Sequence, residues 1–384
     1  MGCYMSHELS IRESTLLSDD LNSKIEKKLE NTRFHGELDS PNTARVLEKT
    51  EILAQYKFYG TLGKGMFCEV RLAKEQGGRL VAVKIIRKKF FADRDSIKKI
   101  IIEKEIMNSL DHRHILKLYR TFQTNSRLFF VLEFAQRGNL LGLINSKAAF
   151  METELQLVAA QIILALLYMH SKGIIYGDLK AENVLFTKEG LLKLCDFNLS
   201  GTTKLLDKTI QGTTSYLAPE IIQEAPKTPK SDFWSLGILL HLMFYKKHAF
   251  SGPTQGAVLA SIVDDEVKCE PPYRVAPARL RRLILDLLVK NPRNRIGNSL
   301  DEFKRHEFFR DFEWREDLAL PEDCFPKPKD NDKLTNSGND TLNQTMNNPV
   351  YDIADFTFDS KAPSEKVQGR ADRDGPQQIG RRFS

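Results

Sequence analysis

The chain has 384 residues, of which 41% are hydrophobic and 28% are charged, and its formal net charge is +6. These fractions are ordinary for a soluble globular protein, and the length predicts one large domain with extensions or two modest domains. The basic residues are scattered among acidic ones and form no focused stripe with interleaved aromatics, which argues against a nucleic-acid-binding protein.

The five cysteines are odd in number and show no ligand-like spacing. We therefore expect a reducing compartment, with neither a disulfide framework nor a zinc site. No apolar run reaches the about 18–20 residues that a membrane-spanning helix requires, so we expect no such helix. The N-terminus also lacks the apolar region of a secretory signal, so we expect a cytoplasmic protein.

The first six residues, MGCYMS, fit an acylation motif. Gly2 is placed for myristoylation and Cys3 for palmitoylation. One myristoyl chain binds membranes with only about 10⁴ M⁻¹, so a second chain is needed for stable residence. We expect a membrane-associated N-terminus; the alternative is an unmodified one.

Residues 1–55 form a polar extension, in which SDDLNSKIEKKLE predicts an amphipathic helix that Ser18 caps. Residues 56–309 are densely periodic. Short β-branched runs (VAVKII, FFVLEF) come first, and long helical patterns (ELQLVAAQIILALLYMH, DFWSLGILLHLMF) follow. This order predicts an α+β fold with a small sheet-rich lobe and a larger helical lobe. Residues 310–384 contain too few apolar side chains to fold alone throughout.

The first motif is GTLGKGMFCEV, in which Gly63 and Gly65 flank a lysine. Glycines let a strand–turn–strand unit close over phosphate groups, with backbone N–H groups donating to the oxygens. Cys68, a small residue, stands where a third glycine is usual. A hairpin that merely contains glycine is the alternative interpretation.

Further on, VAVK ends in Lys84, and a lysine on a buried strand requires a carboxylate or phosphate partner. Glu103, in the helical stretch IIIEKEIM, is the natural partner. Taken singly, either residue could be a surface charge.

YGDLKAEN contains Asp178 and Asn183, and LCDFN contains Asp196. Phosphoryl transfer needs a carboxylate that orients the hydroxyl and accepts its proton, and oxygen ligands for Mg²⁺. Asp178 suits the first task, while Asn183 and Asp196 suit the second.

The order of these motifs, followed by Ala218-Pro219-Glu220, resembles the eukaryotic protein kinases over residues 56–309. The resemblance implies a bilobal, monomeric kinase domain that uses ATP and Mg²⁺ to phosphorylate protein substrates. Lys84 would bind the α- and β-phosphates, and Leu132 would be the gatekeeper of the adenine pocket. Asp232 would brace the catalytic loop, and Arg295 would pair with Glu220. By resemblance the nucleotide contacts are Leu62, Gly63, Lys64, Gly65, Met66, Phe67, Cys68, Val70, Ala82, Lys84, Glu103, Leu132, Glu133, Ala135 and Leu185.

Lys180 and Thr213 match the serine/threonine branch and would join Asp178 as catalytic residues. The flanking segments resemble the AGC group, which includes the cAMP-dependent kinase. LALPEDCFPKPKD resembles the tail that wraps the lobes, and IADFTF resembles the hydrophobic motif that docks on the small lobe, with Thr357 as its phosphosite. A disordered tail with two incidental aromatics is the alternative.

The chain departs from the family pattern at Gly177, where an arginine usually pairs with an activation-loop phosphothreonine. Thr209 occupies that phosphosite position, and Gly201 stands where a second basic residue is found in the cAMP-dependent enzyme. Lys99 is the remaining basic candidate. We therefore expect phosphorylation of Thr209 to be weakly activating at most.

Three other departures bear on the magnesium turn and on substrate choice. Asn198 replaces the glycine of the DFG motif, and Asn tolerates the positive φ that we expect there. Of three acidic residues that hold substrate arginines in basophilic relatives, only Glu182 is kept. Asn139 and Leu242 replace the others, so preference for basic substrates should be weak.

The sequence thus predicts a membrane-anchored serine/threonine kinase. A pseudokinase scaffold that binds nucleotide, and a lipid-tethered adaptor, are the alternatives.

Overall fold

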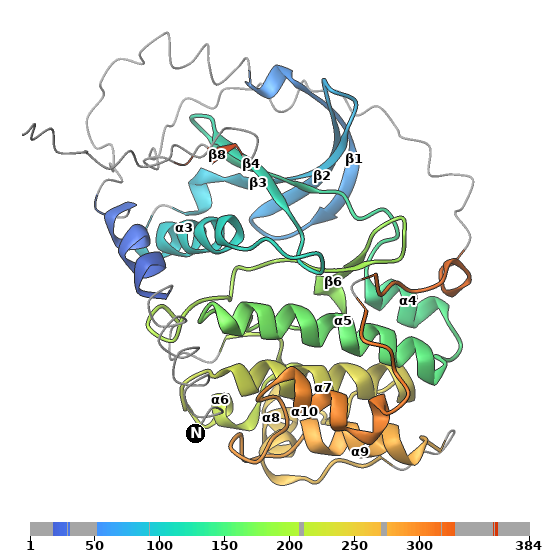
Figure 1. Cartoon of the computed structure of the whole chain (residues 1–384). Coiled ribbons are helices and arrows are strands. Elements are labelled where there is room, and N and C mark those ends of the chain that lie inside the picture. The colour runs from blue at the N-terminus through green and yellow to red at the C-terminus, as the bar shows by residue number, and fades with distance from the viewer. Residues whose placement is uncertain are drawn as a thin grey trace, which may run out of the picture.

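The structure is a computed structural model that describes residues 18–28, 30, 52–91, 93–206, 211–269, 275–315, 317–326, 356, 358 and 359. A small lobe of strands and one long helix lies above a larger helical lobe (Figure 1). The α+β bilobal fold expected from the sequence is therefore confirmed. The division into 1–55, 56–309 and 310–384 stays a prediction.

The small lobe is an antiparallel sheet with strand order β1-β2-β3-β5-β4-β8. The apolar runs VAVKII and FFVLEF lie in the two central strands β3 and β5, where both faces of a strand are covered. The strands are β1 (Tyr56–Lys64), β2 (Cys68–Glu75), β3 (Leu80–Arg87), β4 (Leu118–Gln123), β5 (Arg127–Glu133) and β8 (Phe358–Asp359).

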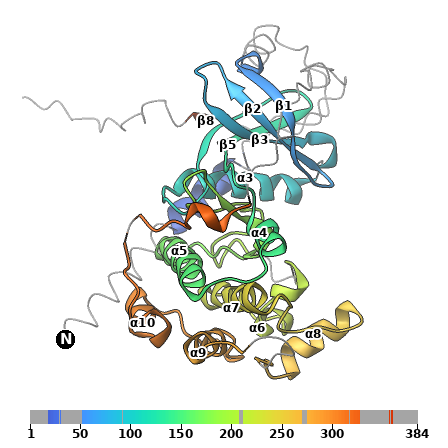
Figure 2. The ribbon, with the colours of Figure 1, turned by 90° about the vertical axis from the view of Figure 1, so that its right-hand side faces the viewer.

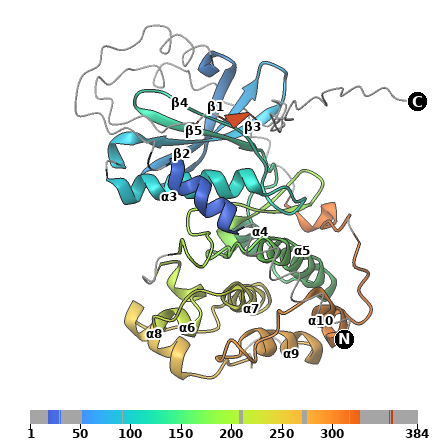
Figure 3. The same cartoon turned by 60° about the vertical axis from the view of Figure 1, so that its left-hand side comes forward.

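Helix α3 (Arg94–Ser109) packs beside this sheet (Figure 3). Asp93 caps it, because its carboxylate accepts a hydrogen bond from the Ser96 N–H at 2.8 Å. The short helix η1 (Lys88–Phe90) connects β3 to this cap. Glu103 lies in the middle of α3 and is buried.

The large lobe is built around α5 (Glu152–Ser171) and α7 (Pro229–Tyr245), which lie against each other (Figure 2). Pro229 stands in the first turn of α7, where its missing N–H costs nothing. The other elements are α4 (Leu140–Ser146), η2 (Ala181–Asn183), β6 (Val184–Phe186), β7 (Leu192–Leu194), η3 (Thr214–Tyr216), α6 (Pro219–Ile222), α8 (Gln255–Asp264), α9 (Ala278–Leu287), α10 (Leu300–Arg305), η4 (Glu307–Phe309) and η5 (Glu322–Cys324).

Within the described residues, α5 is the one helix long and apolar enough to cross a membrane. This corrects the expectation that no segment reaches that length. About two thirds of its apolar window is buried in the large lobe. A helix that is apolar on nearly all sides is what the centre of a lobe requires.

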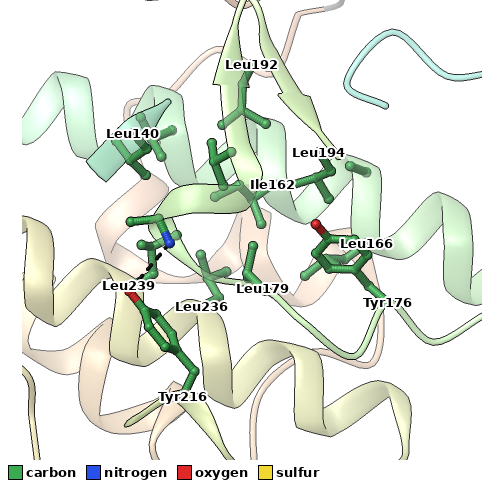
Figure 4. Packing of buried hydrophobic residues seen from close by; sticks show 14 of the residues in the cluster. Leu140, Ile162, Leu166, Tyr176, Leu179, Leu192, Leu194, Tyr216, Leu236 and Leu239 are labelled. Atoms are coloured by element: carbon green, nitrogen blue, oxygen red, sulfur yellow. Dashed lines mark hydrogen bonds between the residues drawn. The ribbon is translucent and has the colours of Figure 1, made fainter. Parts of the chain in front are cut away.

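The core of the large lobe also positions the loop that contains Asp178 (Figure 4). Leu179, from that loop, packs among Ile162 of α5 and Leu236 of α7, and all three are at most 1% exposed. The Tyr216 hydroxyl accepts a hydrogen bond from the Ala181 N–H at 3.4 Å. The contacts with the core of the large lobe therefore fix the loop before any substrate binds.

Candidate active site

Lys84 projects from β3 toward α3 and the segment after β7. Its Nζ lies 2.6 Å from Glu103 Oε1 and 3.3 Å from Asp196 Oδ1. Burial alone lowers the pKa of Lys84, but attraction to Glu103 and Asp196 outweighs it, and the pKa is raised. The ammonium thus stays charged, as binding to phosphate oxygens requires.

Asp178 is the centre of a second group of contacts. Its Oδ2 accepts hydrogen bonds from Lys180 Nζ at 2.6 Å and Asn183 Nδ2 at 2.9 Å. Lys180 Nζ also donates to Thr213 Oγ1 at 3.2 Å. The structure therefore brings together Asp178, Lys180 and Thr213, the three residues predicted to be catalytic.

Burial raises the pKa of Asp178, and the nearby charge of Asp196 raises it further. Lys180 and Asn183 oppose the rise by bonding to the ionised form. A carboxylate in this environment binds a proton more readily than an exposed one, which suits a group that accepts a proton during transfer.

Asp232 of α7 holds the backbone of this loop. Its Oδ1 accepts from the Gly177 N–H at 2.8 Å, and its Oδ2 accepts from the Tyr176 N–H at 2.9 Å and lies 2.8 Å from His170 Nε2. The bracing contact predicted for Asp232 is thus present.

Asn183 lies just before β6 and Asp196 lies two residues after β7, at the same end of the β6–β7 hairpin. The Cys195 N–H donates to the Asn183 carbonyl oxygen at 3.0 Å, which places the two predicted metal ligands close together. Within the described residues, no donor is bonded to Asn183 Oδ1. An amide oxygen and a carboxylate fit Mg²⁺, which commonly takes one or two protein ligands and completes its shell with phosphate and water.

The backbone of the DFN turn differs from the expectation in one respect. Positive φ occurs at Asp196, at 60°, and not at Asn198. The strained position is the residue that carries the carboxylate, so Asn198 is compatible with the turn without using its tolerance of positive φ.

The predicted phosphate loop is the β1–β2 hairpin. The Gly65 N–H donates to the Cys68 carbonyl oxygen at 2.8 Å, and a Cβ on Gly65 would lie only 3.3 Å from Cys68 Sγ. The missing Cβ at Gly65 therefore leaves room for the Cys68 side chain within the turn. The side chains of Leu62, Met66 and Phe67 are exposed, and Gly63 and Lys64 lie at the same open end of the hairpin.

The apolar part of the predicted nucleotide site comes from both lobes. Val70 is paired with Lys84 across β2 and β3, and Ala82 is paired with Leu132 across β3 and β5. Val70 and Leu185 pack against the cluster that contains Ala82 and Leu132, and Ala135 packs against it too. The carboxylate of Glu133 is occupied by Lys193, at 2.9 Å, which leaves the backbone as the adenine-binding part of this connection.

The tail is attached to both lobes. Leu320 donates its N–H to the Gly190 carbonyl oxygen at 3.0 Å, and the Phe325 ring contacts Phe186. Phe356, from IADFTF, is buried and stands edge-on to Phe130 at 5.5 Å. Phe356 is therefore docked on the small lobe and is not an incidental aromatic. Gly2, Cys3, Thr209 and Thr357 lie outside the described residues.

Sequence reasoning missed why residue 177 is glycine. Its φ is +79°, and a Cβ there would lie 2.6 Å from the Leu199 carbonyl oxygen and 3.5 Å from Lys227 Nζ. Lys227 is buried, which lowers its pKa although Asp232 and Asp178 oppose the shift. No local signal in KTPKSD distinguishes this lysine from a surface one, because its position depends on packing between distant segments. Lys99, which the sequence offered as the remaining basic candidate to pair with a phosphate on Thr209, is exposed on α3.

The predicted pair of Glu220 and Arg295 is present as a two-pronged contact, with nitrogen–oxygen distances of 2.7 and 2.9 Å. Both side chains are buried. This contact ties the segment after η3 to the base of the large lobe, away from the reacting groups.

A family model described as protein kinase domain matches residues 56–309. Protein kinase C epsilon type of Oryctolagus cuniculus is 32% identical over 353 residues, which are 87% of this chain and 47% of that protein. The RAC serine/threonine-protein kinase of Drosophila melanogaster is 33% identical over 279 residues, or 71% of this chain and 45% of that protein. Protein kinase C eta type of Homo sapiens is 35% identical over 272 residues, which are 67% of this chain and 39% of that protein.

This chain spans less than half the length of these relatives. The match nevertheless covers the whole region in which Lys84, Asp178 and Asp196 converge. The chain belongs to the eukaryotic protein kinase family and is of the AGC-like type.

Proposed function

We propose that this chain is a serine/threonine protein kinase that transfers the γ-phosphate of ATP to hydroxyl groups of protein substrates. The observation that carries the proposal is the bonding of Asp178 to Lys180 and Asn183 in the same site as the Lys84–Glu103 pair. The RAC relative of Drosophila melanogaster is a serine/threonine-protein kinase by description, which supports the same activity.

In this proposal each contact has a task. Lys84 binds the α- and β-phosphates, held in place by Glu103. Asp178 orients the substrate hydroxyl and accepts its proton, while Lys180 neutralises charge on the phosphoryl group that is transferred. Thr213 accepts a hydrogen bond from Lys180 and so helps to position its ammonium group.

ATP and Mg²⁺ complete the site. Asn183 and Asp196 would hold the metal, which when bound neutralises phosphate charge. The β1–β2 hairpin covers the phosphates with its N–H groups, and Val70, Ala82, Leu132 and Leu185 enclose the base. The backbone of residues 133–135 supplies the polar edge of the adenine pocket.

The test of this function is transfer of radiolabelled phosphate from ATP to a generic protein substrate. The full chain should label the substrate, and Asp178→Asn should not. Labelling by neither protein, with nucleotide still bound, would leave the pseudokinase scaffold. Absence of both labelling and nucleotide binding would favour the lipid-tethered adaptor.

We further propose anchoring by acylation of Gly2 and Cys3. MGCYMS supports this, because the small residue at position 2 and the serine at position 6 satisfy the myristoylation pattern. Fractionation of the Gly2→Ala protein tests it. Retention of that variant with membranes would show that the acyl group is not the anchor.

A further inference from the structure

A helix in the N-terminal extension, residues 18–28, carries the inference. Leu21, Asn22 and Ile25 are buried on one face of it, and Ile25 is fully buried. Isolated helices of about 12–15 residues or fewer are marginal in water, so a helix this short needs partners to be stable. It is therefore held by its contacts with the kinase domain, and Figure 3 shows it lying beside α3.

Its first set of contacts is with α3. Lys28 Nζ lies 2.7 Å from Glu105 Oε1, two residues beyond the Glu103 that pairs with Lys84. The Glu105 side chain is only 6% exposed, so solvent screens this pair little. Leu21 and Ile25 belong to the same apolar cluster as Ile97 and Ile101 of α3.

Its second set is with the segment that follows Asp196. The Thr202 hydroxyl donates to Asn22 Oδ1 at 3.0 Å, and both residues are buried. Lys204 Nζ lies 2.6 Å from Asp19 Oδ1 at the exposed edge of the same contact. Gly201, next to Thr202, is paired with Ile175 just before the loop of Asp178.

The helix thus joins two elements that must be aligned for transfer, α3 with Glu103 and the segment with Asp196. Residue 177, in the loop of Asp178, contributes no side chain to this arrangement. Here the Leu199 carbonyl oxygen stands 2.6 Å from where a Cβ would be, so this backbone admits no side chain at 177.

On the basis of the proposed function, we propose that residues 18–28 are a positioning element that holds α3 and residues 196–206 in the arrangement needed for phosphoryl transfer. Asn22, Ile25 and Lys28 are its positioning residues. None of them touches the reacting groups; they act through Thr202 and Glu105.

The ion pair is tested by charge exchange in the full chain. Lys28→Glu should lower kcat about tenfold, because a charged hydrogen bond is replaced by repulsion. Lys28→Glu combined with Glu105→Lys should recover most of kcat. Lys27→Glu, which makes the same charge change at a neighbouring exposed position, should leave kcat unchanged.

The buried hydrogen bond is tested by a near-isosteric change. Thr202→Val removes the hydroxyl and should lower kcat about threefold to tenfold, whereas Thr202→Ser should retain activity. Added to Asn22→Ala, Thr202→Val should cost little more, because the shared bond is already lost. Additive losses, or no loss for either variant, would contradict the proposal.

A second measurement does not depend on catalysis. Amide hydrogen exchange should rise together in residues 97–107 and 196–206 in Ile25→Ala and Lys28→Glu, while α7 stays protected. If exchange rises in both segments but the parent protein is inactive, the proposed function is overturned and the positioning role of residues 18–28 is kept. If the parent is active and its variants keep both kcat and protection of these amides from exchange, only the positioning role of residues 18–28 is overturned.

Discussion

The position of a Cβ on Gly177 lies 2.6 Å from the carbonyl oxygen of Leu199. The backbone of the catalytic loop and the segment after Asp196 are therefore packed against each other at a point where only glycine fits. An arginine at 177 is excluded by the conformation that surrounds it, and not merely absent.

Restoring that arginine should harm the protein. Gly177→Arg places a bulky residue at positive φ, which costs about 1–3 kcal/mol before the clash with Leu199 is counted. We expect the free energy of unfolding to fall by at least about 2 kcal/mol, with no gain in kcat. Thermal denaturation measures the first effect. Gly77→Ala, with open space around it and no positive φ, is the control that should be nearly neutral.

Thr209 should contribute little to activity. With no cation on residue 177 or 201 to receive a phosphate, phosphorylation gains few of the charged hydrogen bonds worth about 1.5–3 kcal/mol each. We expect Thr209→Ala to lower kcat by less than about threefold. Steady-state kinetics of protein with and without phosphatase treatment measures this. A hundredfold loss would show that another cation receives the phosphate.

Glu103→Gln should weaken the use of ATP without disturbing the fold. The amide keeps the shape but gives up the charge that holds Lys84 at 2.6 Å, so the ammonium turns toward Asp196. We expect kcat/KM for ATP to fall about 10- to 100-fold, since losing a charged hydrogen bond of this kind costs about 1.5–3 kcal/mol. Glu105→Gln is the matched variant on the same helix. It should lower kcat/KM for ATP less than Glu103→Gln does, because Glu105 pairs with Lys28 and not with Lys84, and a larger fall there would contradict the assignment.

Asp178→Asn should remove activity and yet stabilise the fold at neutral pH. Loss of a general base typically costs about 10²- to 10⁴-fold. The pKa of Asp178 is raised by burial, so its contribution to stability is greatest when it is protonated and is lost as pH rises through the raised value. The neutral amide avoids that loss.

Denaturation measured across a range of pH tests the sign of this stability change. Asp178→Asn should be more stable than the parent above the raised pKa, and the difference should vanish below about 3.9, the ordinary value for an aspartate. Glu182→Gln removes an exposed carboxylate four residues away and should show no such dependence. A parent protein that is the more stable of the two at neutral pH would mean that Lys180 outweighs burial.

The convergence of Lys84, Glu103, Asp178 and Asp196 was expected from the resemblance of the motif order to the protein kinases, and the bilobal fold follows from apolar patterns that are local properties of the sequence. The helix at SDDLNSKIEKKLE was predictable for the same reason, from its spacing of apolar residues. The docking of this helix was not predictable, because Asn22 and Thr202 are 180 residues apart and neither segment contains a pattern that indicates its partner. The same holds for Lys227 beside Gly177 and for positive φ at Asp196 in place of Asn198, which depend on tertiary packing.

Preference for basic substrates should be weak and should rest on Glu182. Asn139 uses its side chain to cap α4, accepting from the Gly142 N–H at 2.9 Å, and Leu242 is 8% exposed, so neither offers a carboxylate. Two peptides that differ by one arginine before the phosphorylated serine should differ in kcat/KM by less than about tenfold, the value of one charge-assisted contact. Glu182→Gln should abolish that difference. Asn139→Asp, which keeps an oxygen to cap α4, should widen it, and a preference unchanged by either variant would place substrate recognition elsewhere.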